Sequence, residues 1–421
     1  MLTRLPYSFL WLFVLPVALL RLVWRARRQP GYLKHVGERL GRYRVRAPGK
    51  VIWVHAVSVG ETRAAEPLVR ALLARWPEHT VLLTHMTPTG RETSKALFGG
   101  ESRVLRVYLP YDLGCFMRSF LRHFRPAFGV IMETELWPNL LAACRRRKIP
   151  VLLANARLSE RSAGRYARLP ALTGLTMRAL SAIGAQTAAD AARLSALGAE
   201  RVTITGNIKF DIAPPPAALS LADTFRARIG SRPVLLAAST REGEEGPLLD
   251  AFARLAPPDV LLALVPRHPQ RFDEVAALVR QRGLALQRRS DDSAVDAKTR
   301  VWLGDSMGEM FAYYAAADAA LIGGSWLPLG GQNLIEACAV GTPVIVGPHT
   351  FNFQVVADQA VAANAARRAT DIEDGMAMAL ALLADPGARE AMATAGKRFA
   401  EAHRGATQRS IELLEKLSTG H

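Results

Sequence analysis

Residues 51–75 read VIWVHAVSVGETRAAEPLVRALLAR. The first part, Val51–Ala56, is a short run of branched and aliphatic residues, which is typical of a strand, and Arg63–Arg75 has the apolar spacing of an amphipathic helix. The polar loop Val57–Thr62 lies between them. A strand followed by a loop and a helix is the repeating unit of a parallel sheet that helices cover on both faces. This stretch therefore predicts the α/β class.

The same alternation of apolar runs and helical patterns continues along the chain. Further strands are predicted at Thr80–Thr84, Phe128–Met132, Val151–Ala154, Ala182–Ala185, Val202–Thr205, Pro233–Ala238, Val260–Val265, Arg300–Leu303, Ala319–Gly323 and Pro343–Val346. Residues 213–217, APPPA, interrupt regular structure and predict a hinge. We therefore expect two Rossmann-like doubly wound domains that face a cleft, with ligands at the carboxyl ends of the strands.

Length and charge narrow the possible functions. The 421 residues exceed what one core usually supports, which favours two domains of roughly 200 residues each. Lys+Arg 54 against Asp+Glu 37 gives a net charge of +17, and 8 lysines leave 54 − 8 = 46 arginines. Base composition of the genome explains part of this excess. The remaining positive charge is compatible with three kinds of partner: nucleic acid, an anionic membrane surface or a phosphorylated substrate.

Several classes of protein are excluded by motifs that the sequence lacks. The three cysteines have no metal-like spacing, which argues against a disulfide scaffold or a zinc finger. There is no phosphate loop of the G-x-x-x-x-G-K-[ST] kind, no G-x-G-x-x-G after a strand, no H-E-x-x-H and no Asp-x-Asp pair. ATPase, dehydrogenase and zinc hydrolase activities are therefore not expected.

The N-terminus predicts a membrane anchor. Residues Leu5–Trp24 are almost continuously apolar and long enough to cross the roughly 30 Å hydrocarbon layer. A basic cluster follows, which by the positive-inside rule keeps the rest of the chain in the cytoplasm. Pro16 and Arg21 interrupt the segment, so a helix that lies in the membrane interface is an alternative, and a buried core helix is another.

Residues 57–62, VSVGET, carry the first candidate for chemistry. Because the loop follows a predicted strand, the Glu61 carboxylate is expected at the carboxyl edge of the sheet, and Gly60 lets a substrate approach the backbone. Glu61 is then a candidate general base for an acceptor hydroxyl. The alternative is that Glu61 only complements the positive end of the following helix.

A second polar group follows the predicted strand that ends at Met132. Of its two carboxylates, Glu133 and Glu135, we expect one to cap the next helix and the other to face a ligand, because loop residues i and i+2 point differently. Trp137 is expected in the core. Lys209, near the hinge, is a candidate partner of an anionic leaving group or a carboxylate, with a solvated side chain as the alternative.

Residues 323–337, GGSWLPLGGQNLIEA, combine a strand end, a glycine-rich loop and a helix predicted to begin near Asn333. Bare backbone amides and a helix start favour binding of a phosphate, and Glu336 is a candidate for binding ribose. A capping box of Asn333 and Glu336 is the alternative. Arg267 and the loop 304–310 follow other strands and add a guanidinium and further amides. Together these segments predict a nucleotide-sugar pocket.

These segments, in this order, resemble the Kdo (3-deoxy-D-manno-octulosonic acid) transferases of lipid A assembly, two-domain glycosyltransferases of the GT-B type. The resemblance rests on SVGETRAA, MTPTG, VYLPYDL, METELWPNL, ANARLSERS, TGNIKFD, ASTREGEE, LVPRHPQRF, GDSMGEM, GGQNLIEA and GPHTFNF. The matching stretches extend from the anchor to about Phe353 and so cover most of the chain. Ordered matches of this length are far more specific than a single glycine motif.

The resemblance implies an inverting, metal-independent transfer of Kdo from CMP-Kdo to the tetraacyl disaccharide bisphosphate precursor of lipid A (lipid IVA) in lipopolysaccharide biosynthesis, without a cofactor. It implies that Glu61 is the general base and that Glu133 and Lys209 stabilise the transition state. The CMP pocket that it implies consists of Pro266, Arg267, Gly308, Glu309, Met310, Asn333, Leu334, Ile335 and Glu336. The family often has proline at the position of Leu334, which favours a backbone contact there.

The expected organisation is a membrane anchor at residues 1–30, a Rossmann-like acceptor domain at 31–212 and a Rossmann-like CMP-sugar-binding domain at 213–421, whose last helices can return to the acceptor domain. The enzyme is expected at the cytoplasmic face of the inner membrane, with CMP-Kdo, the lipid A precursor and the anionic membrane surface as partners and without nucleic acid. Two alternatives stay open: another GT-B nucleotide-sugar enzyme, such as a UDP-GlcNAc transferase or epimerase, and a non-catalytic basic protein that docks on membranes.

Overall fold

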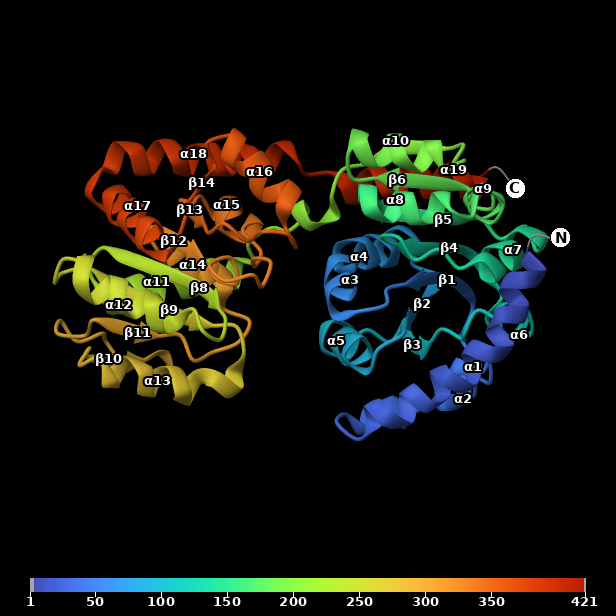
Figure 1. The fold of residues 1–421 in the computed structure, drawn as a ribbon, viewed down its shortest axis with the longest axis horizontal. Coiled ribbons are helices and arrows are strands. Elements are labelled where there is room, and N and C mark those ends of the chain that lie inside the picture. The colour runs from blue at the N-terminus through green and yellow to red at the C-terminus, as the bar shows by residue number, and fades with distance from the viewer. Residues whose placement is uncertain (1–3, 420–421) are drawn as a thin grey trace. The chain divides into compact units, whose positions relative to one another are not determined.

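The computed structural model describes residues 4–419, which form two units (Figure 1). The first unit contains residues 4–211 and 404–419, and the second contains residues 212–403. The change of unit at Asp211 immediately precedes the proline run at 213–217. Residues 1–3 of the predicted anchor and residues 420–421 of the predicted second domain lie outside the described residues.

The first unit is built on a parallel sheet with the strand order β3-β2-β1-β4-β5-β6-β7. Its strands are β1 (Lys50–His55), β2 (His79–His85), β3 (Val104–Tyr108), β4 (Pro126–Met132), β5 (Val151–Ala156), β6 (Ala182–Ala185) and β7 (Val202–Ile204). Its helices are α1 (Leu5–Ala26), η2 (Pro30–Leu33), α2 (Val36–Arg39), α3 (Val59–Ala64), α4 (Glu66–Arg75), α5 (Pro88–Phe98), α6 (Gly114–Phe124), α7 (Pro138–Arg146), α8 (Glu160–Ala167), α9 (Pro170–Met177), α10 (Ala188–Ala196), η3 (Ile208–Phe210) and α19 (Ala406–Thr419).

The second unit repeats this plan with the order β10-β11-β9-β8-β12-β13-β14. Its strands are β8 (Val234–Thr240), β9 (Leu261–Pro266), β10 (Leu286–Arg288), β11 (Val301–Leu303), β12 (Ala319–Ile322), β13 (Val344–Val346) and β14 (Ala366–Arg368). Its helices are α11 (Pro216–Ile229), α12 (Glu245–Leu255), η4 (Pro269–Arg271), α13 (Phe272–Gln281), η5 (Arg289–Asp291), α14 (Met310–Ala316), α15 (Ile335–Val340), α16 (Gln354–Ala362), α17 (Ile372–Ala384) and α18 (Pro386–Ala402).

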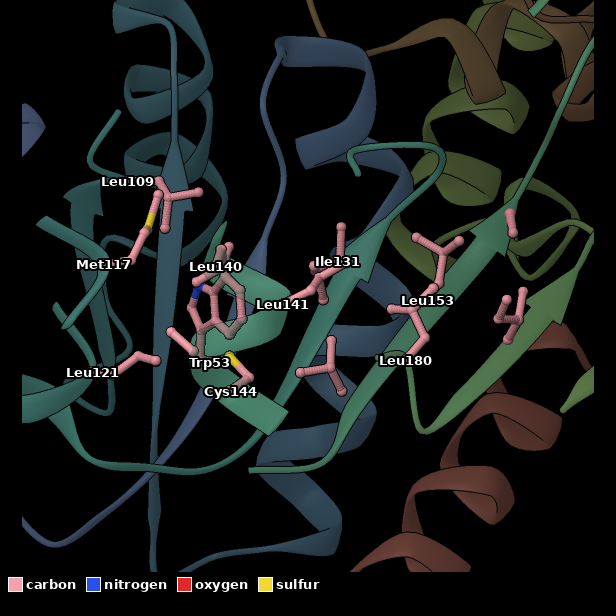
Figure 2. Close-up of a cluster of buried hydrophobic side chains, with 14 of the residues drawn as sticks. Trp53, Leu109, Met117, Leu121, Ile131, Leu140, Leu141, Cys144, Leu153 and Leu180 are labelled. Carbon is pink, nitrogen blue, oxygen red and sulfur yellow. The ribbon is translucent and has the colours of Figure 1, made fainter. Parts of the chain in front are cut away.

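Both faces of the first sheet are buried, as a parallel sheet requires. Trp53 packs on one face with side chains of α6 and α7, as Figure 2 shows. Its neighbours Ile52 and Val54 point to the other face, where they meet side chains of α4 and of the C-terminal helix α19. The return of α19 is held by Asp211, whose carboxylate accepts a hydrogen bond of 2.6 Å from the Gly405 amide.

The predicted strands are confirmed, because each coincides with an observed strand to within two residues at either end. Sequence reasoning missed β3, β10 and β14, which are edge strands of the two sheets. Edge strands have one unpaired side and carry charged residues that interrupt the apolar run, such as Arg106 in β3 and Arg288 in β10. The pattern that identifies a central strand is therefore weak in these three segments.

Helix α1 exposes most of its apolar surface. Its 22 residues span about 33 Å at the rise of an α-helix, and the helix continues through Pro16. Leu22 and Ala26 are its buried residues, whereas Phe13 and Leu20 are 62% and 70% exposed. Within residues 4–419, α1 is the one helix long and apolar enough to cross a membrane. The interpretation of this segment as a buried core helix is therefore wrong.

The packing around Trp53 gives a stability prediction. A Cβ atom added at Gly129 on β4 would lie 2.5 Å from the fully buried Trp53 ring, and neither group can move without disturbing the core. Gly129→Ala is expected to lower the free energy of unfolding by about 1–3 kcal/mol, measured by chemical denaturation. Gly100→Ala is the control, because an added Cβ there meets nothing within 4 Å. Equal stability of the two variants would contradict this packing.

Candidate active site

Glu61 lies in the first turn of α3, so the predicted helix start at Arg63 was wrong by four residues. The helix begins early because the Ser58 hydroxyl caps it and accepts a hydrogen bond from the Glu61 amide. In return the Glu61 carboxylate accepts hydrogen bonds from the Val57 amide at 2.8 Å and from the Ser58 hydroxyl at 3.2 Å. These contacts agree with the helix-capping interpretation, and they also fix the carboxylate in one place.

The strand order brings a second carboxylate to this place. β1 and β4 are neighbours in the sheet, and the chain winds away from them in opposite directions, which makes this the switch point where ligands bind in doubly wound folds. Glu61 follows β1 and Glu133 follows β4. Glu133 has a left-handed backbone with φ of 58°, and its amide donates to the Ala154 carbonyl at 2.9 Å. The loop is therefore anchored to β5 by its backbone, while the side chain remains available to the site.

The environment of Glu61 suits a general base. Burial raises the pKa of Glu61 to about 7, and the nearby carboxylates of Glu133 and Glu135 act in the same direction. The hydrogen bonds from Val57 and Ser58 oppose this rise because they stabilise the ionised form. A pKa near neutrality lets the same group accept and release a proton at physiological pH.

Glu135, the other carboxylate of this loop, accepts a hydrogen bond from the Trp137 ring nitrogen at 3.1 Å. Trp137 is partly buried and packs against the core, as predicted. The prediction that one of the two carboxylates caps helix α7 was wrong, because the amides of Asn139 and Leu140 in its first turn donate instead to the Asp112 carboxylate, both at 2.9 Å. Proline at the first position of α7 leaves no amide there that needs a partner.

Lys209 is brought to the same carboxylates, and the interpretation of it as a solvated side chain is wrong. Its ammonium nitrogen lies 3.9 Å from Glu133 Oε1. The short helix η3 that carries it is held by the fully buried Asn155, whose side-chain oxygen accepts a hydrogen bond of 3.1 Å from the Ile208 amide. Sequence reasoning missed this role of Asn155, although the polar residue within the buried run VLLANA was a detectable signal.

The second unit gathers its polar loops in an equivalent way. Strands β11, β9, β8 and β12 are consecutive in the sheet, and the predicted nucleotide-binding segments follow their carboxyl ends. Arg241 follows β8 and Arg267 follows β9. Burial lowers the pKa of His268, and the guanidinium groups of Arg241, Arg267 and Arg271 act in the same direction. The loops after β8 and β9 therefore form a positive region that suits a phosphate.

The loop after β11 is held by a residue that sequence reasoning did not single out. Arg289 donates to both oxygens of the Glu309 carboxylate, at 3.2 and 3.1 Å. The hydroxyl of Ser306 also donates to Glu309. Gly308 has φ of 83°, and a Cβ atom added there would meet nothing within 4 Å. Met310 begins helix α14 directly after this loop. The backbone around Gly308 is thus open, while the Glu309 side chain is already paired.

The glycine-rich segment after β12 differs from its prediction in one respect. The amides of Gly324 and Trp326 donate to the buried carboxylate of Glu244, at 2.7 and 3.0 Å, so the expectation that they bind a phosphate is wrong. A buried carboxylate needs such donors, and the nearby loop amides satisfy it. Glu244 lies at the start of α12, and its role was not apparent from the sequence pattern.

At the start of helix α15 the side chains of Asn333 and Glu336 are paired with each other. The helix begins at Ile335, whose amide donates to the Asn333 side chain at 3.0 Å, and Asn333 Nδ2 donates to Glu336 Oε1 at 3.0 Å. Asn333 and Glu336 are half-buried at the sheet edge, whereas the Leu334 and Ile335 side chains are fully buried. Leu334 and Ile335 can therefore offer a ligand only their backbone, and the same holds for the buried Pro266 at the end of β9.

Two doubly wound units of this kind define a GT-B-like fold. A UDP-GlcNAc 2-epimerase from Neisseria meningitidis, solved with UDP-GlcNAc, shares this fold with a TM-score of 0.59 at 18% identity, over 87% of this chain and 100% of that chain.

Sequence comparison then identifies the family. Residues 34–212 match the family described as 3-Deoxy-D-manno-octulosonic-acid transferase (kdotransferase). The 3-deoxy-D-manno-octulosonic acid transferase of Bordetella pertussis is 47% identical over 93% of this chain and 94% of its own length. The enzyme of the same description from Haemophilus influenzae is 38% identical over 98% of both chains. The chain belongs to the Kdo transferase family and is a glycosyltransferase.

The proximity of the two glutamates predicts a coupled titration. Glu133→Gln removes one of the negative charges that raise the pKa of Glu61, so the pKa of Glu61 is expected to fall. The change is measured by NMR titration of isotope-labelled glutamate side chains. Glu66→Gln is the control, because the Glu66 carboxylate pairs with Arg70 on the same helix. An unchanged Glu61 titration in Glu133→Gln would show that the two carboxylates do not interact.

Proposed function

We propose that this chain transfers Kdo from CMP-Kdo to a hydroxyl of the lipid A precursor lipid IVA, with inversion and without a metal ion, in lipopolysaccharide biosynthesis. The membership of the chain in the Kdo transferase family supports the sugar that is transferred. The observation that carries the mechanism is the Glu61 carboxylate, whose pKa is about 7 and which is influenced by the charge of Glu133, the ion-pair partner of Lys209.

Glu61 supplies the base that an inverting transfer requires. Its carboxylate takes the proton of the acceptor hydroxyl while that oxygen forms a bond to the anomeric carbon of Kdo. The bond from this carbon to the phosphate oxygen of CMP breaks at the same time, and CMP leaves with the bonding electron pair. The proton remains on Glu61 and passes to water afterwards.

Glu133 and Lys209 have complementary roles in this proposal. Lys209 places a positive charge 3.9 Å from Glu133, where it balances the carboxylates and stabilises negative charge on the reacting groups. Glu133 orients that ammonium group and stabilises the positive charge that develops on the sugar ring. Both residues therefore act on the transition state rather than on proton transfer.

The nucleotide part of the donor is assigned to the second unit. The positive region around Arg267 binds the phosphate of CMP, with the backbone near Gly308 and the half-buried Asn333 and Glu336 beside it. A guanidinium group stabilises a leaving phosphate by two parallel hydrogen bonds. Metal independence is part of the proposal because the sequence has no Asp-x-Asp pair, the usual holder of a metal beside a nucleotide sugar.

The same proposal places the enzyme at the cytoplasmic face of the inner membrane. The exposed apolar surface of α1 supports attachment to a bilayer, and the basic residues that follow the helix favour the cytoplasmic side. The acceptor carries acyl chains and two phosphates, so it is drawn from the same bilayer. Attachment to the bilayer restricts the search for this substrate to the plane of the membrane.

The first prediction concerns catalysis by Glu61. Glu61→Gln is expected to lower the transfer rate by about 10²–10⁴-fold, because the amide cannot accept the proton. The single-turnover rate of the wild type should rise tenfold per pH unit below about pH 7 and become constant above it, since the ionised form is the base. Unimpaired turnover by Glu61→Gln would exclude the assigned role, and retained CMP binding shows that the variant is folded.

A stability measurement tests the same pKa without activity. The folded pKa of Glu61 is about 7 and its ordinary value is 4.5, so the folded protein binds more protons than the unfolded chain between these values. The free energy of unfolding therefore falls as the pH rises through this window. Chemical denaturation across the window should show a smaller decline in Glu61→Gln than in the wild type. Identical declines would contradict the raised pKa.

A further prediction of the proposed function concerns binding of the nucleotide. Arg267→Ala is expected to weaken CMP binding about 10–100-fold, the usual effect of losing a charge-assisted hydrogen bond, measured by isothermal titration calorimetry. Arg254→Ala is the control, because Arg254 is exposed on α12 and pairs with Glu373. CMP should stabilise the fold against heat more than UDP does. Preferential stabilisation by UDP would favour a different nucleotide-sugar enzyme.

A further inference from the structure

A cavity of about 530 Å³ opens on the first unit, away from the loops described above. It lies between the C-terminal end of α6 and the segment that leads into β1. Three of its lining residues are arginines, namely Arg46, Arg122 and Arg125, and none is acidic. Its volume is in the range of small-molecule sites.

The walls of this arginine cavity are fixed by hydrogen bonds. The hydroxyl of Ser119 on α6 donates to the Gly41 carbonyl at 2.8 Å. One turn further, the Nε2 atom of His123 pairs with the Val45 carbonyl at 2.7 Å. The Tyr43 ring packs between these two points against Phe124, with ring centroids 4.8 Å apart. The extended segment before β1 is therefore attached to α6 along its length, and the cavity is preformed.

The positive charges of the cavity lack counter-ions. Within residues 4–419, no ion pair or side-chain hydrogen bond joins the guanidinium groups of Arg46, Arg122 or Arg125 to the protein. Some guanidinium groups elsewhere in the chain are paired, as Arg91 is with Glu38 at 2.6 Å.

The dipole of α6 does not account for these charges. Cations are favoured at the C-terminal end of a helix, and α6 ends at Phe124 beside Arg122 and Arg125. A helix end, however, carries only about half an elementary negative charge. Three guanidinium groups exceed this by about two and a half charges. All three arginines are exposed to solvent, so an anion from solution can reach them.

The cavity is separate from the candidate active site. It adjoins the first residues of β1 and β4, since Gly49 and Arg125 line it and the strands begin at Lys50 and Pro126. Glu61 and Glu133 follow the opposite ends of the same two strands. At about 3.3 Å per residue, strands of this length separate the two places by roughly 20 Å.

We propose that the arginine cavity binds a ligand that carries two or more phosphoryl groups, apart from the site of sugar transfer. Guanidinium groups bind phosphate oxygens with paired hydrogen bonds, and three of them match the charge of such a ligand. The ligand is either a soluble oligophosphate or the headgroup of a bisphosphorylated lipid, because both present this chemistry. The proposal does not depend on the proposed function.

The test compares two double variants of the full-length protein. Arg46→Ala/Arg122→Ala removes two charges from the cavity, while the Arg125 position, with φ of 45°, is left intact. Arg42→Ala/Arg118→Ala is the matched control, because these exposed residues lie on the same segment and the same helix but do not line the cavity. Both variants have the same net charge, and none of the four side chains belongs to the hydrophobic core.

Binding is measured in two arms at fixed ionic strength. Calorimetry measures the binding of tripolyphosphate to the protein. Flotation measures the binding of the protein to vesicles of phosphatidylcholine with and without cardiolipin. At least tenfold weaker binding in the cavity variant than in the control supports the proposal, and the arm that shows it identifies a soluble or a lipid ligand. Binding in neither arm, or equal loss in both variants, overturns it.

Discussion

The chemistry of the first unit depends on one constraint, which is that the Glu61 carboxylate is held partly out of water beside a second carboxylate. Burial and the charge of Glu133 raise the pKa of Glu61, while the Val57 amide and the Ser58 hydroxyl keep the group in position. The ammonium nitrogen of Lys209 lies 3.9 Å from Glu133 Oε1 and places a positive charge beside this second carboxylate. The result is a carboxylate that is fixed in place and ionises near neutral pH.

The winding of the sheet produces this constraint. Glu61 and Glu133 are far apart in the sequence, yet β1 and β4 are adjacent in the sheet, so the loops that follow them meet at one edge. Lys209 reaches the same edge from β7, on the far side of the sheet, because Asn155 draws the short helix η3 back towards β5. The positions of all three groups therefore depend on the parallel order of the strands.

The second unit is also built on a seven-stranded parallel sheet, with a different strand order, but it uses its carboxylates differently. Glu244 holds the glycine-rich loop through two backbone amides, and Glu309 is held by Arg289. Glu245 is likewise buried against Arg271 at 2.5 Å. These acidic groups shape the loops of the second unit, in which Arg241, Arg267 and Arg271 lie near His268. The first unit thus places a carboxylate with a raised pKa at its switch point, and the second unit places arginines after β8 and β9.

The amino-acid sequence by itself determined the α/β class, the central strands and the polar segments that follow them, because apolar periodicity and loop composition are local properties. Its motifs, through their resemblance to a family, also indicated Glu61, Glu133 and Lys209 together. Only the tertiary structure decided which groups meet: the ion pair of Lys209 with Glu133, the use of loop amides by Glu244, and the unpaired arginines beside α6. The edge strands β3, β10 and β14 were also found only in the tertiary structure, because a strand that pairs on one side alone can carry charged residues. The physical reason is that burial, pKa and ion pairing depend on neighbours distant in the chain, which no local pattern records.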